Sequence, residues 1–242
     1  MNSVTILQSA ADLRPDWVSR CMASVEDWAK SQGYAYQCIG DELFDWVPHE
    51  LRNKLRDRKP ILADIARLRW MESELATRAG PVVWVDADTL AMDATWRVPD
   101  SQHTFFGEEC WVQQTSDGGW RAFLSPHNAF MGFTAASPVL GFLAYLSESI
   151  IERADAGHIA PQMIGPKLLK ALNNFAQFPL VPEAGALSPP LLAEWVRGHG
   201  GAHACYVQQN RPELALINLC SSLNRQAGQI SLINTFLDRS AP

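Results

Sequence analysis

The stretch Gly80-Pro81-Val82-Val83-Trp84-Val85-Asp86-Ala87-Asp88 carries the strongest structural signal in this chain. Its apolar run, Val82–Val85, is typical of a strand that is buried on both faces. Two aspartates follow the run directly, one residue apart. Ligands of open α/β sheets bind outside the carboxyl ends of the strands. The stretch therefore predicts a buried strand whose ligand-binding end carries two carboxylates.

The segments on the N-terminal side alternate between strand and helix patterns. Apolar residues spaced three and four apart predict a helix over residues 15–30, between apolar runs at 4–7 and 34–39 that fit strands. A second helix is predicted over residues 60–78, immediately before the strand that ends in the aspartates. Because strands that alternate with helices are typical of an α/β fold, we expect a central, mostly parallel sheet flanked by helices.

The C-terminal side of the chain mixes hairpin and helix patterns. Residues 104–115 and 120–124 predict two strands around the turn Asp117-Gly118-Gly119, which would form a small antiparallel element. A further strand is predicted over residues 129–133, and a long loop over residues 179–190. Helical patterns are found over residues 138–154, 161–173, 213–223 and 231–238.

Composition excludes several classes of protein. The 242 residues are 47% hydrophobic and 19% charged, which is typical of a globular chain with a large core. A formal net charge of −6 argues against a general nucleic-acid-binding protein. No apolar run approaches the ~20 residues that span a bilayer, and the first residues show no signal-peptide pattern. Five cysteines without framework spacing indicate reduced thiols, so we expect a cytoplasmic protein that can still meet a membrane surface peripherally.

Asp86 and Asp88 suit a complex between a divalent cation and a diphosphate. Mg²⁺ is held in proteins by one or two carboxylates together with substrate phosphate oxygens. Asp64 and Arg67, three apart on the predicted helix over residues 60–78, share one helical face. An aspartate can accept hydrogen bonds from sugar hydroxyls, and an arginine can bind a phosphate with two N–H groups. The alternatives without a functional role are a surface ion pair between Asp64 and Arg67 and a solvated turn that contains Asp86 and Asp88.

Lys59-x4-Asp64-Ile65-x-Arg67, followed by the stretch 80–88, resembles the sugar-binding region of glycosyltransferases that contain a DxD motif. This group includes fungal-type mannosyltransferases, bacterial capsule sugar transferases and the clostridial toxin glucosyltransferases. Gly80-Pro81 stands where the pattern of the family has two glycines. The resemblance is close over about residues 59–92 and extends loosely to residues 4–39, 127–131 and 164–166.

The resemblance implies an A-type glycosyltransferase fold formed by one domain, residues 1–242, with a nucleotide-sugar-binding half over about 1–100 and an acceptor-side half over about 101–242. It implies transfer of a sugar, with Mn²⁺ or Mg²⁺, from a UDP- or GDP-sugar to a hydroxyl of a sugar, lipid-linked or protein acceptor, with retention of configuration. The catalytic residues would be Asp88 and Arg67. The substrate would be bound by Asp64, Arg67, Asp86 and Asn128, and the metal by Asp86, Asp88 and His203.

Several roles stay open at this point. His199 is an alternative to His203 as a metal ligand, because both lie beside glycines that permit close backbone approach. If the reaction inverts configuration, the general base would be one of Glu108, Glu109, Asp117 and His127. The side chains that could stack on a sugar or a base are Trp111, Trp120 and Trp195.

Two other functions fit the same residues. Val85-Asp86-Ala87-Asp88-Thr89 also matches the nucleophile motif of haloacid-dehalogenase-type phosphatases, in which Asp86 would form an aspartyl-phosphate. That motif normally lies on the first strand and precedes a further acidic motif, and neither feature is present in this sequence. The other alternative is a catalytically inactive module that binds a nucleotide sugar.

Overall fold

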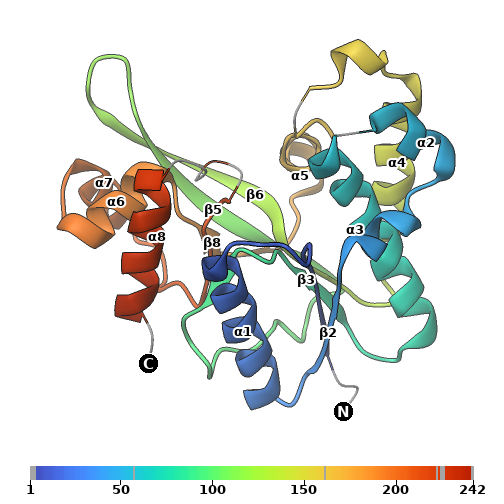
Figure 1. The fold of residues 1–242 in the computed structure, drawn as a ribbon, viewed down its shortest axis with the longest axis horizontal. Helices are drawn as coiled ribbons and strands as arrows, with labels where there is room; N and C mark the ends of the chain where they lie inside the picture. The colour runs from blue at the N-terminus through green and yellow to red at the C-terminus, as the bar shows by residue number, and fades with distance from the viewer. Residues whose placement is uncertain (1–3, 57, 161, 222, 224–226, 241–242) are drawn as a thin grey trace.

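The chain folds into an α/β structure around a six-stranded sheet (Figure 1). This computed structural model describes residues 4–56, 58–160, 162–221, 223 and 227–240. The strands are β1 (Thr5–Ser9), β2 (Ala35–Ile39), β3 (Val82–Val85), β4 (Thr89–Ala91), β5 (Thr104–Gln114), β6 (Trp120–Phe133), β7 (Leu180–Val181), β8 (Ala184–Ala186) and β9 (Leu216–Asn218). The helices are α1 (Asp16–Ser31), α2 (His49–Leu55), α3 (Lys59–Thr77), α4 (Val139–Arg153), α5 (Pro166–Ala176), α6 (Pro189–Arg197), α7 (Gly201–Val207) and α8 (Ala227–Ser240), with the 3₁₀ helices η1 (Asp41–Trp46) and η2 (Ala156–His158).

The large sheet has the strand order β2-β1-β3-β6-β5-β7, and each strand except β6 runs in the same direction. The small sheet, β4-β9-β8, combines one antiparallel and one parallel pairing. Strand β1, helix α1 and strand β2 form the predicted parallel crossover, and α3 leads into β3. The prediction of an α/β fold with a mostly parallel sheet flanked by helices is therefore confirmed.

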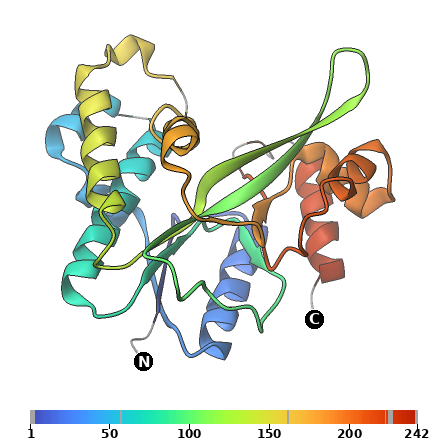
Figure 2. The same cartoon turned by 180° about the vertical axis from the view of Figure 1, so that it is seen from behind.

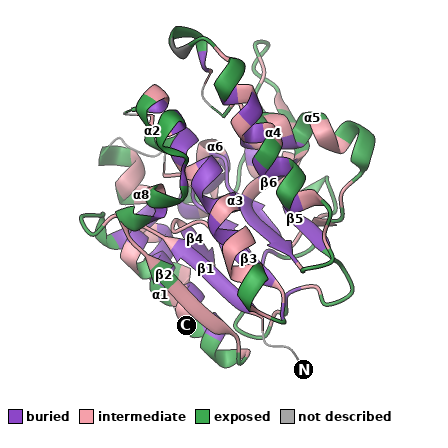
Figure 3. Cartoon of the chain, turned by 90° about the vertical axis from the view of Figure 1, so that its right-hand side faces the viewer, coloured by how far each residue is buried: buried purple, intermediate pink, exposed green. Residues whose placement is uncertain are grey.

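Helices cover both faces of the large sheet. On one face, α3 and α4 pack their apolar residues onto the sheet around Trp84 (Figure 2). On the other face, α1 packs Val25 and Trp28 against the same strands. Strand β3 is buried along its whole length between these layers, as Figure 3 shows. The first carboxylate after this strand, Asp86, follows at its carboxyl end.

A bulge in the hairpin of β5 and β6 shapes the wall of the site. Residues 128–130 of β6 have no partner on β5, because the register shifts between Phe106 and Gly107. A bulge bends its strand and redirects the side chains that it carries. Gly107 permits the close approach of the chains here, because a Cβ atom would overlap the imidazole of His127 and lie 2.6 Å from the carbonyl oxygen of Ala184.

Strand β6 is continuous where the sequence predicts two strands, over residues 120–124 and 129–133. Pro126 lies between them and favours a break. In the structure, Pro126 lies in the part of β6 that extends beyond β3 and pairs with β5 alone. Because proline has no backbone N–H group, at most one hydrogen bond between β5 and β6 is lost at this position.

The prediction of a helix over residues 213–223 is wrong. These residues contain β9, whose residues are all buried between β4 and β8, because strand pairing outweighs the local pattern. The predicted loop over residues 179–190 contains β7 and β8, and helices α6 and α7 are not predicted. Helix α5 begins at Pro166, and residue 161, where the prediction begins, lies outside the described residues. No helix in the described part of the chain has the length and apolar character to cross a membrane.

We expect Gly107→Ala to lower the free energy of unfolding by about 1–3 kcal/mol, because the added methyl group must displace His127 or the backbone at Ala184. Unfolding in urea, followed by circular dichroism, measures the change. The control is Gly228→Ala, where an added Cβ atom meets no other atom within 4 Å, and its stability should be unchanged or slightly higher. Equal stability of the two variants would show that the bulge does not depend on Gly107.

Candidate active site

Two adjoining cavities open at the carboxyl end of β3. The first, of about 320 Å³, lies between the end of β1, η1 and the start of α3. The second, of about 580 Å³, lies between α3, the β5–β6 hairpin and the segment that follows β9. The residues that line both cavities are Pro60, Arg67, Asp86, Asp88 and Ser221. The paired aspartates therefore lie where the two cavities meet.

The buried side chain of Arg67 holds three elements together. Its Nη2 donates to Asp64 Oδ1 at 2.8 Å, while its Nη1 donates to Asp86 Oδ1 at 2.9 Å and to the carbonyl oxygen of Asn128 at 3.0 Å. Its Nε donates to the carbonyl oxygen of Ala63 at 3.2 Å. A guanidinium has five N–H groups, so within the described part of the chain one remains for a ligand.

Trp84 and Arg67 together fix the carboxylate of Asp86. The indole Nε1 of Trp84 donates to Asp86 Oδ1 at 2.6 Å, and the guanidinium of Arg67 lies 5.2 Å from the centre of the indole ring. A cation over an indole face is favourable. Asp86 Oδ1 thus accepts two hydrogen bonds. Its Oδ2 has no donor among the described residues, so this oxygen can bind a ligand.

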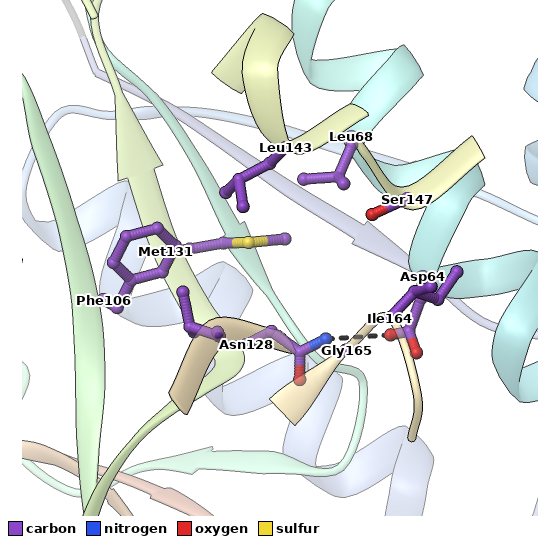
Figure 4. Close-up of a pocket in the computed structure, with 10 residues that line it drawn as sticks. Asp64, Leu68, Phe106, Asn128, Met131, Leu143, Ser147, Ile164 and Gly165 are labelled. Atoms are coloured by element: carbon purple, nitrogen blue, oxygen red, sulfur yellow. Dashed lines mark hydrogen bonds between the residues drawn. The ribbon is translucent and has the colours of Figure 1, made fainter. Parts of the chain in front are cut away.

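Asp64 and Asn128 both line the second cavity, and Figure 4 shows how these two side chains face each other. Asn128 Nδ2 donates to Asp64 Oδ1 at 2.8 Å. A small cavity of about 20 Å³ behind them is lined mainly by apolar side chains, Met131 among them. Gly165 covers the pair from the start of α5, and a Cβ atom there would lie 2.5 Å from Asp64 Oδ2. The absence of a side chain at Gly165 therefore lets this loop close over the pair.

Asp88 connects the site to the segment that follows β9. Its Oδ1 accepts from Asn218 Nδ2 at 2.6 Å, and its Oδ2 accepts from the backbone N–H of Ser221 at 2.7 Å. Cys220 adopts the left-handed conformation, with φ 52°, in the turn between these two residues. Strained backbone of this kind persists only where the surrounding structure holds it. Asp88 is thus both a cavity residue and the anchor of this turn.

The carboxyl groups of the site have altered acidity. Burial raises the pKa of Asp64, against the opposing effect of Arg67. Burial, and then the charge of Asp86, raise the pKa of Asp88, although the hydrogen bond from Ser221 lowers it. Burial works against the charged form of Arg67, but the neighbouring aspartates outweigh it and raise the pKa of this side chain. At the junction of the cavities Arg67 is thus the positive charge that balances the carboxyl groups of Asp64, Asp86 and Asp88.

The structure does not bring His203 or His199 to the paired aspartates. The backbone N–H of His203 donates to Glu194 at 2.7 Å, and its ring lies 3.8 Å from that of His199. Helix α7, which carries His203, packs beside the far end of the β5–β6 hairpin, where Gly201 contacts Trp120. Neither histidine lines either cavity. The expectation of a histidine beside the aspartates is therefore corrected, because the hairpin and Glu194 hold α7 elsewhere.

The candidate bases differ in where they lie. Glu109 lines the second cavity, and its Oε1 accepts from Ser125 Oγ at 3.0 Å. Glu108 forms an ion pair with Arg211 at 2.5 Å. Asp117 is exposed in the turn of the hairpin, where hydrogen bonds from neighbouring residues lower its pKa. Of these three carboxylates, Glu109 alone faces the second cavity.

The aromatic candidates divide between the cavity and the core. His127 lines the second cavity, but its Nε2 donates to the carbonyl oxygen of Ala184 at 2.9 Å and its Nδ1 accepts from a backbone N–H. Both ring nitrogens are therefore engaged, and the ring holds the bulge instead of acting as a base. Trp111 lines the second cavity, whereas Trp120 and Trp195 pack in the core around α6.

The junction fits a divalent cation only together with a phosphate ligand. Among the described residues, no group of three or more His, Cys, Asp or Glu side chains is placed to hold a metal ion. Asp86 and Asp88 supply two carboxylates on one wall, and hard cations combine such a pair with phosphate oxygens. The donor set therefore fits Mg²⁺ or Mn²⁺ bound to a diphosphate, and it does not fit a metal held by the protein alone.

Asn218 and Ser221 are site residues that the sequence does not predict. The helix expected over residues 213–223 gives no reason for a turn at these residues, where the structure has the end of β9 and a turn. A signal was present, because the apolar run at 214–217 is followed at once by Asn218, which is the pattern of a short strand and a turn. Nothing in the local pattern indicates that the turn meets Asp88.

Comparisons with known proteins inform the fold. No family model and no curated protein matches the sequence. A glycosyltransferase involved in the glycosylation of the major capsid of PBCV-1 has a similar structure, with a TM-score of 0.50 and 10% sequence identity over 98% of this chain and 99% of that chain. At this identity the likeness shows a shared fold. The chain therefore has the fold of a glycosyltransferase, and its activity has to be argued from the site.

We expect Arg67→Met to lower the free energy of unfolding by about 3–5 kcal/mol, because the buried carboxylate of Asp64 and the partly buried carboxylate of Asp86 would lose their positive partner. Unfolding in urea measures the loss. Arg20→Met is the control, because it removes an ion pair of the same 2.8 Å length, to Asp238, from an exposed position, where the cost should stay below ~1 kcal/mol. Similar costs for the two variants would count against Arg67 as the centre of the site.

Proposed function

We propose that this chain transfers a sugar from a nucleotide-sugar donor to an acceptor hydroxyl with the help of a divalent cation. The observation that carries the proposal is the junction of two cavities at Asp86 and Asp88, beyond the end of a doubly buried strand. Ligands of α/β sheets bind at such ends. A donor whose diphosphate lies at the junction has one cavity for its nucleoside and the other for its sugar. The glycosyltransferase fold of the similar structure supports this proposal.

The first cavity suits the nucleoside of the donor. Small residues at the end of β1, Ser9 to Ala11, form one wall and leave room for a flat ring. Phe44 offers an aromatic face, and Lys59 Nζ lies 5.5 Å from the centre of that ring. In this proposal the base stacks on Phe44, and Lys59 exchanges its exposed ion pair with Asp41 for the diphosphate.

The second cavity suits the sugar that is transferred. Arg67 and Asn128 both bind Oδ1 of Asp64, and Oδ2 of this residue has no donor among the described residues. We assign Oδ2 of Asp64 and the side-chain oxygen of Asn128 to hydroxyls of the donor sugar. Because both side chains are already held in place, the sugar is oriented without a further ordering cost in the protein.

The reaction breaks the bond between the anomeric carbon and the diphosphate oxygen and forms a bond from that carbon to the acceptor oxygen. A divalent cation on Asp86 and Asp88 would supply positive charge for the leaving diphosphate, to which the remaining N–H group of Arg67 adds. We propose retention of configuration, with the acceptor proton passing to the leaving phosphate and Glu109 binding the acceptor. An inverted anomeric signal in the proton NMR spectrum of the product would make Glu109 the base.

The site favours transfer over the phosphatase alternative. An aspartyl-phosphate mechanism needs Asp86 as a nucleophile, but Arg67 and Trp84 both donate to this carboxylate and make it a weaker one. It also needs a further acidic motif beyond a later strand, and in the described lining of the second cavity only Glu109 follows Asp88 as an acidic residue. A catalytically inactive module would share the binding geometry, and hydrolysis of a nucleotide sugar separates it from a transferase.

We expect UDP or GDP to bind only when a divalent cation is present, because phosphate oxygens and the carboxylates of Asp86 and Asp88 repel each other without one. Titration calorimetry with Mn²⁺, and again with a chelator, measures this difference. Mn²⁺ alone should bind weakly, since the described residues offer no cluster of three metal-binding side chains. Equal nucleotide affinity in the chelator would remove the metal from the proposal.

We expect Asp86→Asn to lower the hydrolysis of nucleotide sugars by about 10²–10³-fold with little change in stability. The asparagine oxygen can keep both hydrogen bonds of Asp86 Oδ1, while its amide group removes the charge. Asp88→Asn should lose activity and also about 1–3 kcal/mol of stability, because both of its oxygens accept hydrogen bonds. Release of nucleoside diphosphate from a panel of donors is the measurement, and exposed Asp238→Asn is the control. Wild-type rates in folded Asp86→Asn protein would refute the mechanism.

A further inference from the structure

The register of the β5–β6 hairpin divides its side chains between two faces. Residues that lie directly opposite each other in an antiparallel pair share a face. One face carries the pairs Cys110–Leu124, Val112–Ala122 and Gln114–Trp120. Helices α6 and α7 cover this face at Cys110 and Val112, which are buried in the core, whereas Leu124 and Gln114 of the same face are exposed. The other face carries the pairs Glu109–Ser125, Trp111–Phe123 and Gln113–Arg121, which we call the hairpin strip.

The hairpin strip has no such cover in the described part of the chain. Trp111 and Phe123 are only half-buried, and neither belongs to one of the hydrophobic cores. Gln113 and Arg121 are exposed, and the guanidinium of Arg121 lies 4.9 Å from the centre of the Phe123 ring. Two large, half-buried aromatic rings thus lie beside polar groups on a strand surface, outside the hydrophobic cores of the described residues.

The hairpin strip is continuous with the proposed catalytic cavity. Glu109 and Trp111 both line the second cavity, together with Asp64, Asp88 and Asn128. From there the strip runs outward along the hairpin, which projects as an arm from the large sheet (Figures 1 and 2). Gln113 is four residue steps along the strand from Glu109, so the strip is ~13 Å long at the usual rise of a strand. That length exceeds one sugar ring.

The chemistry of the hairpin strip indicates a carbohydrate. A sugar ring has an apolar face of C–H groups that packs on an aromatic ring, and hydroxyls at its edge that bond to side chains such as Gln113 and Arg121. A nucleic acid would need an excess of positive charge, whereas the charged residues of the strip are one arginine and one glutamate, whose charges cancel. A lipid chain would leave the polar groups of the strip without partners.

Building on the proposed function, we infer that the acceptor is an oligosaccharide of at least two sugar units that lies along the hairpin strip. Its terminal unit enters the second cavity beside Glu109 and presents the hydroxyl that is glycosylated. The next units stack on Trp111 and Phe123. The strip thus selects the acceptor, whereas Asp64, Asp86 and Asp88 select the donor.

Binding of the labelled full chain to an immobilised panel of gluco-, manno- and chito-oligosaccharides of one to six units tests this inference. We expect at least one series to bind, with affinity that increases from one to three units. Trp111→Ala and Phe123→Ala should each weaken this binding by about tenfold or more. Tyr145→Ala, an aromatic that is 61% exposed on α4, should not. Gln113→Ala on the strip and Gln114→Ala, which is exposed on the opposite face of the hairpin, form a second pair of variants, which serves if an aromatic variant does not fold.

Binding of UDP or GDP with Mn²⁺, measured on the same variants, separates this inference from the proposed function. Intact nucleotide binding with lost oligosaccharide binding in the strip variants supports the inference. If the protein binds nucleotide but none of the oligosaccharide series, the inference is overturned and the proposed transferase is not. The same holds if it binds single sugars as well as oligosaccharides, or if Trp111→Ala does not weaken the binding. If the protein binds oligosaccharides through Trp111 but binds no nucleotide, the hairpin strip is a carbohydrate-binding site and not the acceptor site of a transferase.

Discussion

The buried charge of Arg67 is the constraint on which the site depends. A guanidinium that is removed from water must be surrounded by acceptors, and this one is bound by Asp64, Asp86 and the backbone of the β6 bulge. Each acceptor comes from a different element, so the arginine sets the distance between α3, the end of β3 and β6. Its position also orients two carboxylates whose second oxygens remain for ligands. Stability and preorganisation of the site therefore have the same origin.

A second link, through Asp88, closes the site from the other end of the chain. Asn218 and Ser221 bind its two oxygens and thereby hold the segment after β9 over both cavities. The positive φ of Cys220 shows that the backbone is forced into this turn. The small sheet β4-β9-β8 makes the closure possible, because β4 follows Asp88 directly and pairs with β9. Residues far apart in the sequence thus share one carboxylate.

The likeness to a glycosyltransferase structure and the geometry of the site bear on different questions. At 10% identity the likeness concerns the path of the backbone, and a fold can host unrelated activities. The chemistry is argued from the paired carboxylates, the two cavities that meet there and the Asp64–Asn128 pair beyond them. In the proposed function the cation and the diphosphate bind together, and the described residues hold no group of three or more metal-binding side chains. The hairpin strip is the surface that we propose for the acceptor, apart from the residues proposed for the donor.

Local patterns in the sequence predict the elements around the donor residues and the elements that carry them. The run Val82–Val85 and the helical spacing before it are short-range signals, and Asp64, Arg67, Asp86 and Asp88 lie on or beside them. Their common cavity follows from the rule that ligands gather at strand ends. The sequence also predicts two strands of the hairpin, but not the bulge between Phe106 and Gly107 that positions Asn128.

Only the tertiary structure decided the remainder of the site. Strand β9 forms because β4 and β8 pair with it on both sides, although the longer pattern over residues 213–223 is interpreted as a helix. The turn at Asn218 and Ser221 meets Asp88 for the same reason, and His203 is kept away because α7 is held against the hairpin. Contacts between distant segments depend on strand pairing and on the burial of whole faces, and neither is encoded in the spacing of neighbouring residues.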